Sequence, residues 1–224
     1  MQEGTMRVAV DAVVFTIMHD ELRILLIKRK YEPFQGKYAL PGGFVHADEE
    51  LEHACQRELE EETNVQQIFL KQFGAYGGVK RDPRGRILSV AYFALIRPEQ
   101  KLIASFDATE PRWHSVYDLP ELGFDHSKII ADALRQLRYE LQTTNIAFQI
   151  LPERFTLREL QQVYELVLDK KLDKRNFRKR IKELRILEET AEHKMEGAHR
   201  PAQLYRFCTP AHQNIRKKVN VFLQ

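Results

Sequence analysis

The stretch GFVHADEELEHACQRELEEETNV, residues 43–65, decides the fold of the front of this chain. It follows a predicted strand, and its sequence predicts a loop followed by a helix. That helix carries an unusual number of carboxylates. Glu58, Glu61 and Glu62 stand at i, i+3 and i+4, so their side chains share one helix face, where like charges repel. Asn64 is placed to end the helix in a left-handed conformation, which puts two of these carboxylates at the negative end of the helix dipole.

A divalent cation would relieve this crowding of negative charge. Magnesium takes oxygen ligands and usually keeps waters and substrate phosphates in its other positions, which suits an acidic patch beside a loop. The alternative is a solvated acidic helix face, since that is the usual meaning of a run of charges. The spacing of the carboxylates favours the metal site.

Six positions around this helix resemble the Nudix box, with apolar Leu59 and Val65 between and after them: Gly43, Glu49, Arg57, Glu58, Glu61 and Glu62. Six fixed positions in a strand, loop and helix context are far more specific than a lone glycine motif. One position departs, because Asn64 stands where the family usually has glycine. Asparagine also adopts the left-handed conformation, so the cap and the metal face are expected to survive.

The resemblance implies a Nudix fold, a mixed sheet sandwiched by helices, and hydrolysis of a nucleoside diphosphate linked to another group. It also implies magnesium, with manganese as an alternative ion, because a bound metal neutralises the diphosphate while a free carboxylate accepts a proton. The implied catalytic residues are Glu49, Arg57, Glu58 and Glu61. The implied metal ligands are Glu58, Glu61, Glu62 and the backbone of Gly43.

The composition is that of an ordinary soluble protein, with 224 residues, 43% hydrophobic and 30% charged. No apolar run approaches the length of a bilayer span, and the first residues lack the pattern of a signal peptide, so we expect a cytoplasmic protein without a membrane partner. Cys55 and Cys208 are expected to be buried thiols rather than a disulfide or a zinc site.

Charge is distributed unevenly along the chain. Residues 1–150 carry 18 basic and 22 acidic side chains, whereas residues 151–224 carry 17 and 10, giving formal net charges of −4 and +7. Helical periodicity is lost over residues 143–155, which include Pro152, so the domain boundary is placed there. The predicted domains are a Nudix-like domain at 1–145, a basic module at 152–210 and a tail at 211–224.

In the front domain, β-branched apolar runs predict strands and one 3.6-residue pattern predicts a helix. The expected strands are Arg7–Ile17, Glu21–Arg29, Tyr38–Val45, Gln67–Tyr76 and Ile87–Ile96, and the expected helix runs to about Leu141 with Asp125 as its candidate N-cap. Trp113 could stack on an adenine or fill the core, and the core is favoured.

Several cationic side chains are candidates for binding a ligand phosphate. The loop joining the last two strands holds three of them around Asp82, Pro83 and Gly85, a rigid cationic turn suited to phosphate, although a charged hairpin tip that only serves solubility fits equally well. A strand-end arginine is more often a solvated rim residue, and a histidine ahead of a helix more often a surface residue. The candidates are Arg29, Lys80, Arg81, Arg84 and His126.

The basic module reads as two helices and a hairpin. Thr156 and Glu159 form a capping box at the start of the first helix. The second helix, Lys174–Leu184, turns apolar residues inward at i, i+4 and i+7 and leaves cations outward, as a DNA recognition helix does. Strands at 186–190 and 203–207 would form a wing around a tip with His199. The candidate DNA contacts are Lys174, Arg175, Asn176, Arg178, Lys179 and Arg200; the alternative is a helical dimerisation appendage with a solvated basic face.

A Nudix-like domain followed by this winged helix-turn-helix resembles the Nudix-related transcriptional regulators, which include repressors of NAD metabolism and regulators of sugar pathways. The resemblance implies an α+β protein that binds ADP-ribose or a related phosphorylated metabolite and, as a homodimer, a double-stranded DNA operator. The alternative is an ADP-ribose pyrophosphatase first, with an accessory winged helix, because the box residues are intact. A pure interaction protein would require both patterns to be coincidences.

Overall fold

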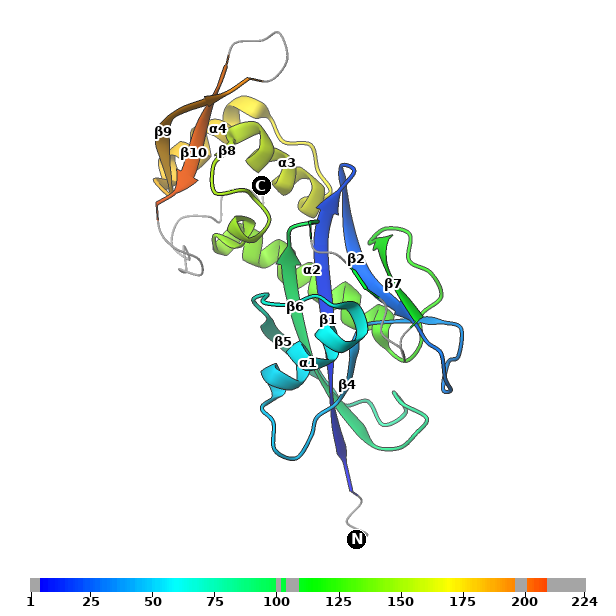
Figure 1. The fold of residues 1–224 in the computed structure, drawn as a ribbon. Coiled ribbons are helices and arrows are strands. Elements are labelled where there is room, and N and C mark those ends of the chain that lie inside the picture. Colours follow the sequence, from blue (N-terminus) through cyan, green and yellow to red (C-terminus); the bar gives the residue numbers. More distant parts are fainter. Residues whose placement is uncertain (1–4, 100–101, 104–108, 196–200, 209–224) are drawn as a thin grey trace. The chain divides into compact units, whose positions relative to one another are not determined.

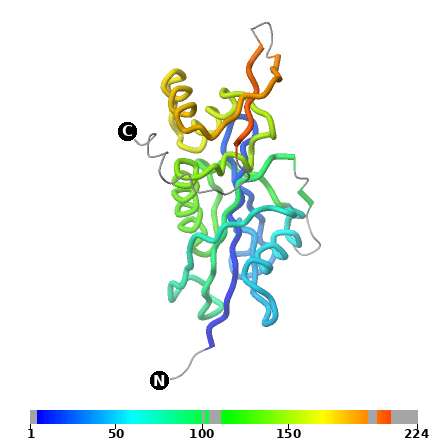
Figure 2. The backbone as a smooth tube through the Cα atoms, turned by 90° about the vertical axis from the view of Figure 1, so that its left-hand side faces the viewer, coloured from blue at the N-terminus to red at the C-terminus, as the bar shows by residue number. Residues whose placement is uncertain are grey.

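The computed structural model describes residues 5–99, 102–103, 109–195 and 201–208, which Figures 1 and 2 trace along the chain. The chain divides into two compact units, residues 1–135 and residues 136–224. The division falls inside one continuous helix, α2 (His126–Thr143), so α2 contributes its first residues to one unit and its last residues to the other. The predicted domain bounds stay predictions.

The first unit is built on β1 (Arg7–Met18), which pairs in parallel with β6 (Ile87–Ile96) from Arg7 opposite Ile87 to Thr16 opposite Ile96. The sheet order is β3-β2-β1-β6-β5, with β4 on β1 and β7 on β2. The remaining strands are β2 (Glu21–Lys28), β3 (Tyr38–Ala39), β4 (Gly42–Phe44), β5 (Lys71–Tyr76) and β7 (Thr109–Ser115).

Alternation along β1 assigns its residues to the two faces of the sheet. Val10, Ala12 and Val14 pack in one core with Cys55 and Leu59 of α1 (Leu51–Thr63). Figures 1 and 2 show α1 and the start of α2 on opposite faces of the sheet, as expected of a sheet sandwiched by helices. Trp113 packs against the α1 core, which confirms the favoured interpretation of this residue.

The strand predicted over 38–45 is two short strands instead, and the reason is local. Gly42 has φ of 153°, and a Cβ there would lie 2.1 Å from the carbonyl oxygen of Val10. The amide of Ala12 donates to the carbonyl of Pro41 at 2.8 Å, so the chain is bound to β1 between β3 and β4. The strand predicted from Gln67 begins only at Lys71, because the chain turns at Gln67 with φ of 52°.

The end of α1 and the two cysteines test further predictions. Asn64 ends α1 with φ of 62° and ψ of 17°, and its amide donates to the carbonyl of Glu60, so the predicted left-handed cap is confirmed. Cys55 is buried as expected, whereas Cys208 is exposed, and both thiols are free. The expectation of a buried Cys208 was wrong, because this residue follows the last strand of the wing rather than a core position.

The second unit is a winged helix. Its helices are α3 (Leu157–Leu168) and α4 (Lys174–Leu184), and its sheet has the order β8-β10-β9, from β8 (Phe155–Thr156), β10 (Ala202–Phe207) and β9 (Leu187–Lys194). A short 3-10 helix, η1 (Ile146–Gln149), precedes them. The capping box of Thr156 and Glu159 is present, as predicted.

The apolar side of α4 holds the winged helix together. Phe177, Ile181 and Leu184 are buried, and the Phe177 ring meets that of Tyr164 on α3 with centroids 5.4 Å apart. Asp173 caps α4 by accepting from the amide of Asn176. The predicted wing tip with His199 and Arg200 lies outside the described residues.

Candidate active site and nucleic-acid interface

In the candidate active site, Arg57 donates hydrogen bonds to three carboxylates, those of Glu49, Glu58 and Glu61. Its Nε and Nη2 donate to the two carboxylate oxygens of Glu49 at 3.0 and 2.7 Å, and Nη1 donates to Glu58 at 2.9 Å and to Glu61 at 3.4 Å. Nη2 also donates to the carbonyl of Phe44 at 3.2 Å. The Arg57 guanidinium lowers the pKa of Glu49 to about 2, so this carboxylate is a fixed anion that orients the arginine.

Glu58 and Glu62 meet the glycine backbone at the start of β4. A Cβ on Gly43 would lie 2.3 Å from Oε1 of Glu58, so only glycine lets this carboxylate approach the chain so closely. The amide of Gly42 donates to Oε2 of Glu62 at 2.8 Å. Burial raises the pKa of Glu62 to about 8 and raises that of Glu58, since both carboxylates lose solvation.

This arrangement differs from the predicted convergence of three carboxylates. Glu61 is more than half exposed and, of the residues that the structure describes, contacts only Arg57, whereas Glu58 and Glu62 lie against the two glycines. Within the part of the chain that the structure describes, no three carboxylate, thiol or imidazole side chains are gathered as a metal site. Two oxygen-donating carboxylates beside a glycine backbone still fit magnesium, which needs only one or two carboxylates besides waters and phosphates.

A pocket opens beside these carboxylates, on the side of the sheet where α2 begins. It holds about 460 Å³ of space, part of which is open to solvent. It is lined by Ala9, Val10, Asp11, Arg29, Leu40, Gly42, Gly43, Phe44, Arg81, Asp82, Arg84, Phe124 and His126.

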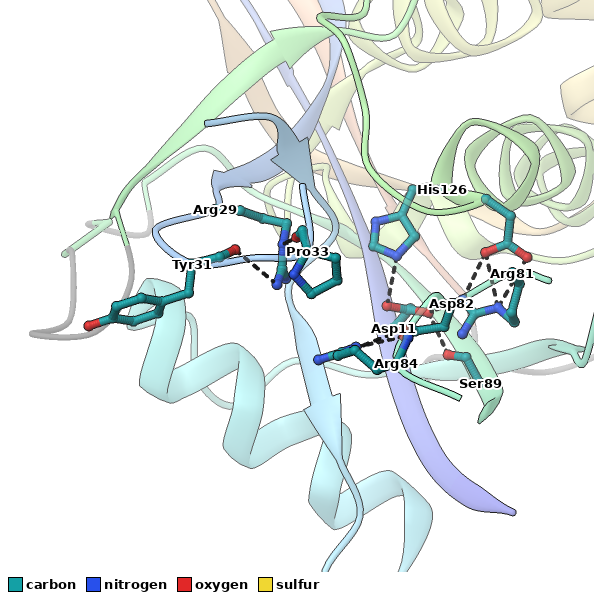
Figure 3. Close-up of polar contacts among 10 residues, drawn as sticks. Asp11, Arg29, Tyr31, Pro33, Arg81, Asp82, Arg84, Ser89 and His126 are labelled. Carbon is teal, nitrogen blue, oxygen red and sulfur yellow. Dashed lines mark hydrogen bonds and ion pairs between the residues drawn. The ribbon is translucent and has the colours of Figure 1, made fainter. Parts of the chain in front are cut away.

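Three guanidiniums, those of Arg29, Arg81 and Arg84, and the aromatic rings of Phe44 and Phe124 line this pocket. Arg29 lies over the ring of Phe124, with 4.9 Å between the guanidinium carbon and the ring centroid. It donates to the carbonyls of Pro33 and Tyr31 at 2.7 and 3.4 Å (Figure 3), so among the described residues it has no carboxylate partner. Burial and the nearby charge of Arg84 lower the pKa of Arg29. Arg84 itself is bound to Asp82. Arg29 is therefore the pocket cation best placed to receive an anion.

The floor of the pocket is a buried polar network centred on Asp11 of β1. Ser89 donates to its Oδ2, Nη2 of Arg81 lies 3.4 Å from the same oxygen, and Nε2 of His126 lies 3.4 Å from Oδ1 (Figure 3). Nδ1 of His126 accepts from the amide of Leu40 at 2.9 Å, so its proton is on the nitrogen that faces Asp11. Burial opposes ionisation of Asp11, but these partners outweigh it and hold its pKa below its usual range.

The predicted ligand residues are therefore only partly brought together. Arg29, Arg81, Arg84 and His126 line the pocket, whereas Lys80 is exposed and does not. The expectation that His126 is a surface residue was wrong, since it is 4% exposed.

Two aspartates that bind Arg81 have roles that the sequence reasoning did not assign. Asp125 stands at the predicted N-cap position, directly before α2, but its carboxylate oxygens accept from Arg81 rather than from an amide of the first helical turn among the described residues. Sequence reasoning missed Asp11 altogether. The available signal was a single acidic residue inside an apolar strand, because a buried carboxylate needs a hydrogen-bonding or charged partner.

The candidate nucleic-acid interface is the outer side of α4. At 100° per residue, Arg175 and Lys179 point away from the buried side formed by Phe177 and Ile181. In contrast, Lys182 is paired with Glu189 at 3.5 Å. The exposed basic and amide side chains of α4 that form no hydrogen bond or ion pair with other described residues are Lys174, Arg175, Asn176, Arg178 and Lys179, and they outnumber Glu183, the only acidic residue of this helix. They present uncompensated positive charge, as phosphate binding requires.

Comparison with known protein families identifies a matching domain family for each of the two units. Residues 6–133 match the NUDIX domain family, and residues 147–207 match the NrtR DNA-binding winged helix domain. The fold and the site thus define a Nudix domain joined to a DNA-binding domain.

Relatives over nearly the whole chain narrow this class further. The ADPR responsive transcriptional repressor NtrR of Acinetobacter baylyi is 38% identical over 205 residues, 89% of this chain and 81% of its own. A crystal structure of Shewanella oneidensis NrtR complexed with a 27-mer DNA has a TM-score of 0.77 and 34% identity, covering 89% of this chain and 93% of that one. This chain belongs to the NrtR family of Nudix-domain transcriptional regulators.

A second relative matches the Nudix domain alone. The ADP-ribose pyrophosphatase of Methanocaldococcus jannaschii is 43% identical over 129 residues, 57% of this chain and 73% of its own. Nudix domains use a divalent metal ion, and the carboxylates beside Gly42 and Gly43 supply the oxygen ligands that such an ion takes.

No described helix is both long enough and apolar enough to cross a membrane.

Proposed function

We propose that this chain is a transcriptional repressor that binds operator DNA through α4 and binds ADP-ribose in the pocket of its Nudix domain. The observation that carries the proposal is the presence, in one chain, of a cationic pocket beside Nudix carboxylates and a winged helix with an uncompensated basic face. The Acinetobacter relative, similar across both units, is an ADPR-responsive repressor.

In the pocket, the diphosphate of ADP-ribose is assigned to the guanidiniums of Arg29 and Arg84. Arg29 has donors directed at backbone carbonyls rather than at a carboxylate, so an anion gains a charge-assisted contact without separating an existing ion pair. The rings of Phe44 and Phe124 lie beside these guanidiniums and offer apolar surface to the rest of the ligand.

A matched pair of variants tests this assignment. Arg29→Ala removes a pocket cation, and Lys80→Ala removes an exposed cation on the loop that also carries Arg84. We expect Arg29→Ala to weaken ADP-ribose binding at least about tenfold in isothermal titration, the loss typical of a charged hydrogen bond, while Lys80→Ala changes it less than about twofold. Equal effects of the two variants would contradict the assignment.

The DNA-binding part is tested with a duplex selected by the protein from a random pool. Fluorescence anisotropy of that duplex should report tight binding, and saturating ADP-ribose should shift the dissociation constant by about fivefold or more, the usual scale of coupling between sites. A selected duplex whose binding is the same with and without ADP-ribose would refute a ligand-responsive repressor.

A second function, hydrolysis of ADP-ribose, is favoured by the intact box and by the similarity to a pyrophosphatase. Magnesium, or manganese in its place, would be held by Glu58 and Glu62 with the backbone of Gly43, and when bound it would neutralise the diphosphate and activate water. Arg57 keeps Glu49 and Glu58 in position, and the exposed Glu61 is the carboxylate free to accept a proton.

Release of AMP from ADP-ribose measures this second function. Turnover by the wild-type chain with magnesium, lost in a Glu61→Gln, Glu62→Gln double variant, would establish hydrolysis. If ADP-ribose binds but is not turned over, the site binds this ligand without hydrolysing it, and the carboxylates serve ligand binding only.

We also propose a homodimer, because winged-helix proteins commonly read two half-sites of a palindromic operator with two copies of the recognition helix. Analytical ultracentrifugation of the free protein and of the protein on a selected duplex tests it. Two chains on each duplex support the dimer, and a single chain contradicts it.

A further inference from the structure

The first residues of α2 are joined to both walls of the pocket. Arg81, on the loop between β5 and β6, donates from Nε to Oδ1 and Oδ2 of Asp125 at 3.1 Å each, and from Nη2 to Oδ1 at 2.8 Å. His126, the first residue of α2, accepts from the amide of Leu40, which lies just before the glycines beside the carboxylates. A displacement of Arg81 or of Leu40 would therefore alter a hydrogen bond at the start of α2.

Asp125 is bound to the helix through its backbone as well as to the pocket through its side chain. Its carbonyl accepts from the amides of Lys128 and Ile129 at 3.0 and 3.2 Å, which form the first turn of α2. Its carboxylate could have accepted from an amide of that turn, but it accepts from Arg81 instead. One residue thus links the pocket loop and the helix.

Arg81 is shared between this helix and the pocket floor. Its side chain is only 5% exposed, and besides Asp125 its Nη2 lies 3.4 Å from Asp11, which faces the pocket (Figure 3). Charge attraction between buried groups is screened far less than at the surface. An anionic ligand in the pocket would attract Arg81 and repel both aspartates, so it would redistribute the bonds that Arg81 makes.

The other end of α2 is tied to the helices of the winged-helix unit. Nε of Arg138 donates at 2.9 Å to the carbonyl of Val167, one of the last carbonyls of α3. The chain then turns through Asp169 and enters α4 after Asp173. α2 is one continuous helix of 18 residues, and the division between the two units falls within it.

We propose that the ion pair of Arg81 and Asp125 is the positioning contact through which occupancy of the pocket acts on α2 and, through α2, on DNA binding. This inference rests on the proposed ADP-ribose-responsive function and specifies how that site is read out. Ligand alters DNA affinity only if it favours one arrangement of this contact over another, because equal affinity for both arrangements shifts nothing.

The test is the response ratio, defined as the DNA dissociation constant with saturating ADP-ribose divided by that without it, measured with the full chain. Asp125→Asn keeps the size of the side chain and removes the charge that holds Arg81. Asp132→Asn is its matched control, because it makes the same change on α2 at a carboxylate that binds Lys128, Arg135 and Tyr76 outside the pocket.

We expect Asp125→Asn to bring the response ratio to within about twofold of one, while ADP-ribose affinity by titration calorimetry stays within about fivefold of wild type; a coupling contact, unlike a ligand contact, separates these two quantities. Asp132→Asn should keep the wild-type ratio. A wild-type ratio in Asp125→Asn overturns the inference, and so does an equal loss in both variants. If wild-type protein itself shows a ratio of one, it is the proposed function that fails.

A second variant covers the case in which Asp125→Asn does not fold, as judged by circular dichroism. Arg81→Lys keeps the positive charge but cannot bind the carboxylate with two parallel hydrogen bonds. It should bring the response ratio to within about twofold of one when ADP-ribose is present at a concentration that titration calorimetry shows to saturate this variant. An unchanged ratio in Arg81→Lys overturns the inference as well.

Discussion

Replacing Arg175 by alanine should reduce the salt dependence of DNA binding by a calculable amount. Arg175 is exposed on α4, opposite the buried Phe177, and it forms no ion pair with other described residues. Each phosphate contact contributes about 0.9 to the slope of log affinity against log salt, so loss of one contact shrinks the affinity change between about 50 and 200 mM salt by about 3.5-fold.

Lys182→Ala is the matched control, because Lys182 lies on the same helix but is already paired with Glu189 at 3.5 Å. Its removal should change the slope by much less than Arg175→Ala does. Anisotropy titrations of one duplex at four or more salt concentrations give both slopes. An unchanged slope for Arg175→Ala would refute the assignment of this residue to a phosphate, and equal slopes for both variants would show that pairing does not decide which cations bind DNA.

Three further changes test other parts of the account. Phe177→Ala should destabilise the winged helix by about 3–5 kcal/mol in denaturant unfolding, since this ring is 1% exposed; a loss below about 1 kcal/mol would contradict its place in the core. Gly43→Ala should weaken manganese binding, followed by electron paramagnetic resonance, because its methyl group would displace the Glu58 carboxylate; unchanged binding would remove Glu58 from the metal site. Burial raises the pKa of Glu159, but Lys194 and Thr156 outweigh it and lower the pKa below the unfolded value of about 4.3, so its charge stabilises the fold above that pH and this gain is lost as pH falls through the folded pKa. Glu159→Gln should therefore cost unfolding free energy at about pH 7 but not at about pH 2, and an equal cost at both would contradict this.

The elements that the sequence predicted well are those whose signals are local. The bounds of α4, Lys174–Leu184, and of β6, Ile87–Ile96, agree with the predicted ranges because a cap or an uninterrupted apolar run marks each end. The capping box of Thr156 and Glu159 was predictable for the same reason, since both partners lie within one helical turn.

The pocket floor was not predictable, because its partners are far apart in the sequence. Asp11 meets Arg81 across 70 positions and Ser89 across 78, contacts that exist only once β1 lies beside β6. The carboxylates of α1 show the same limit at short range. Helix spacing placed Glu58, Glu61 and Glu62 on one face, but their side-chain directions depend on Arg57 and on the amide of Gly42.

The most direct test of a linked ligand site and DNA site is reciprocity. If ADP-ribose changes DNA affinity by some factor, DNA must change ADP-ribose affinity by the same factor. Titration of ADP-ribose into the free protein and into the protein saturated with a selected duplex, in magnesium-free buffer to prevent hydrolysis, measures the second factor. The account predicts two ADP-ribose dissociation constants that differ by about fivefold or more and match the shift in DNA affinity; identical constants would contradict it.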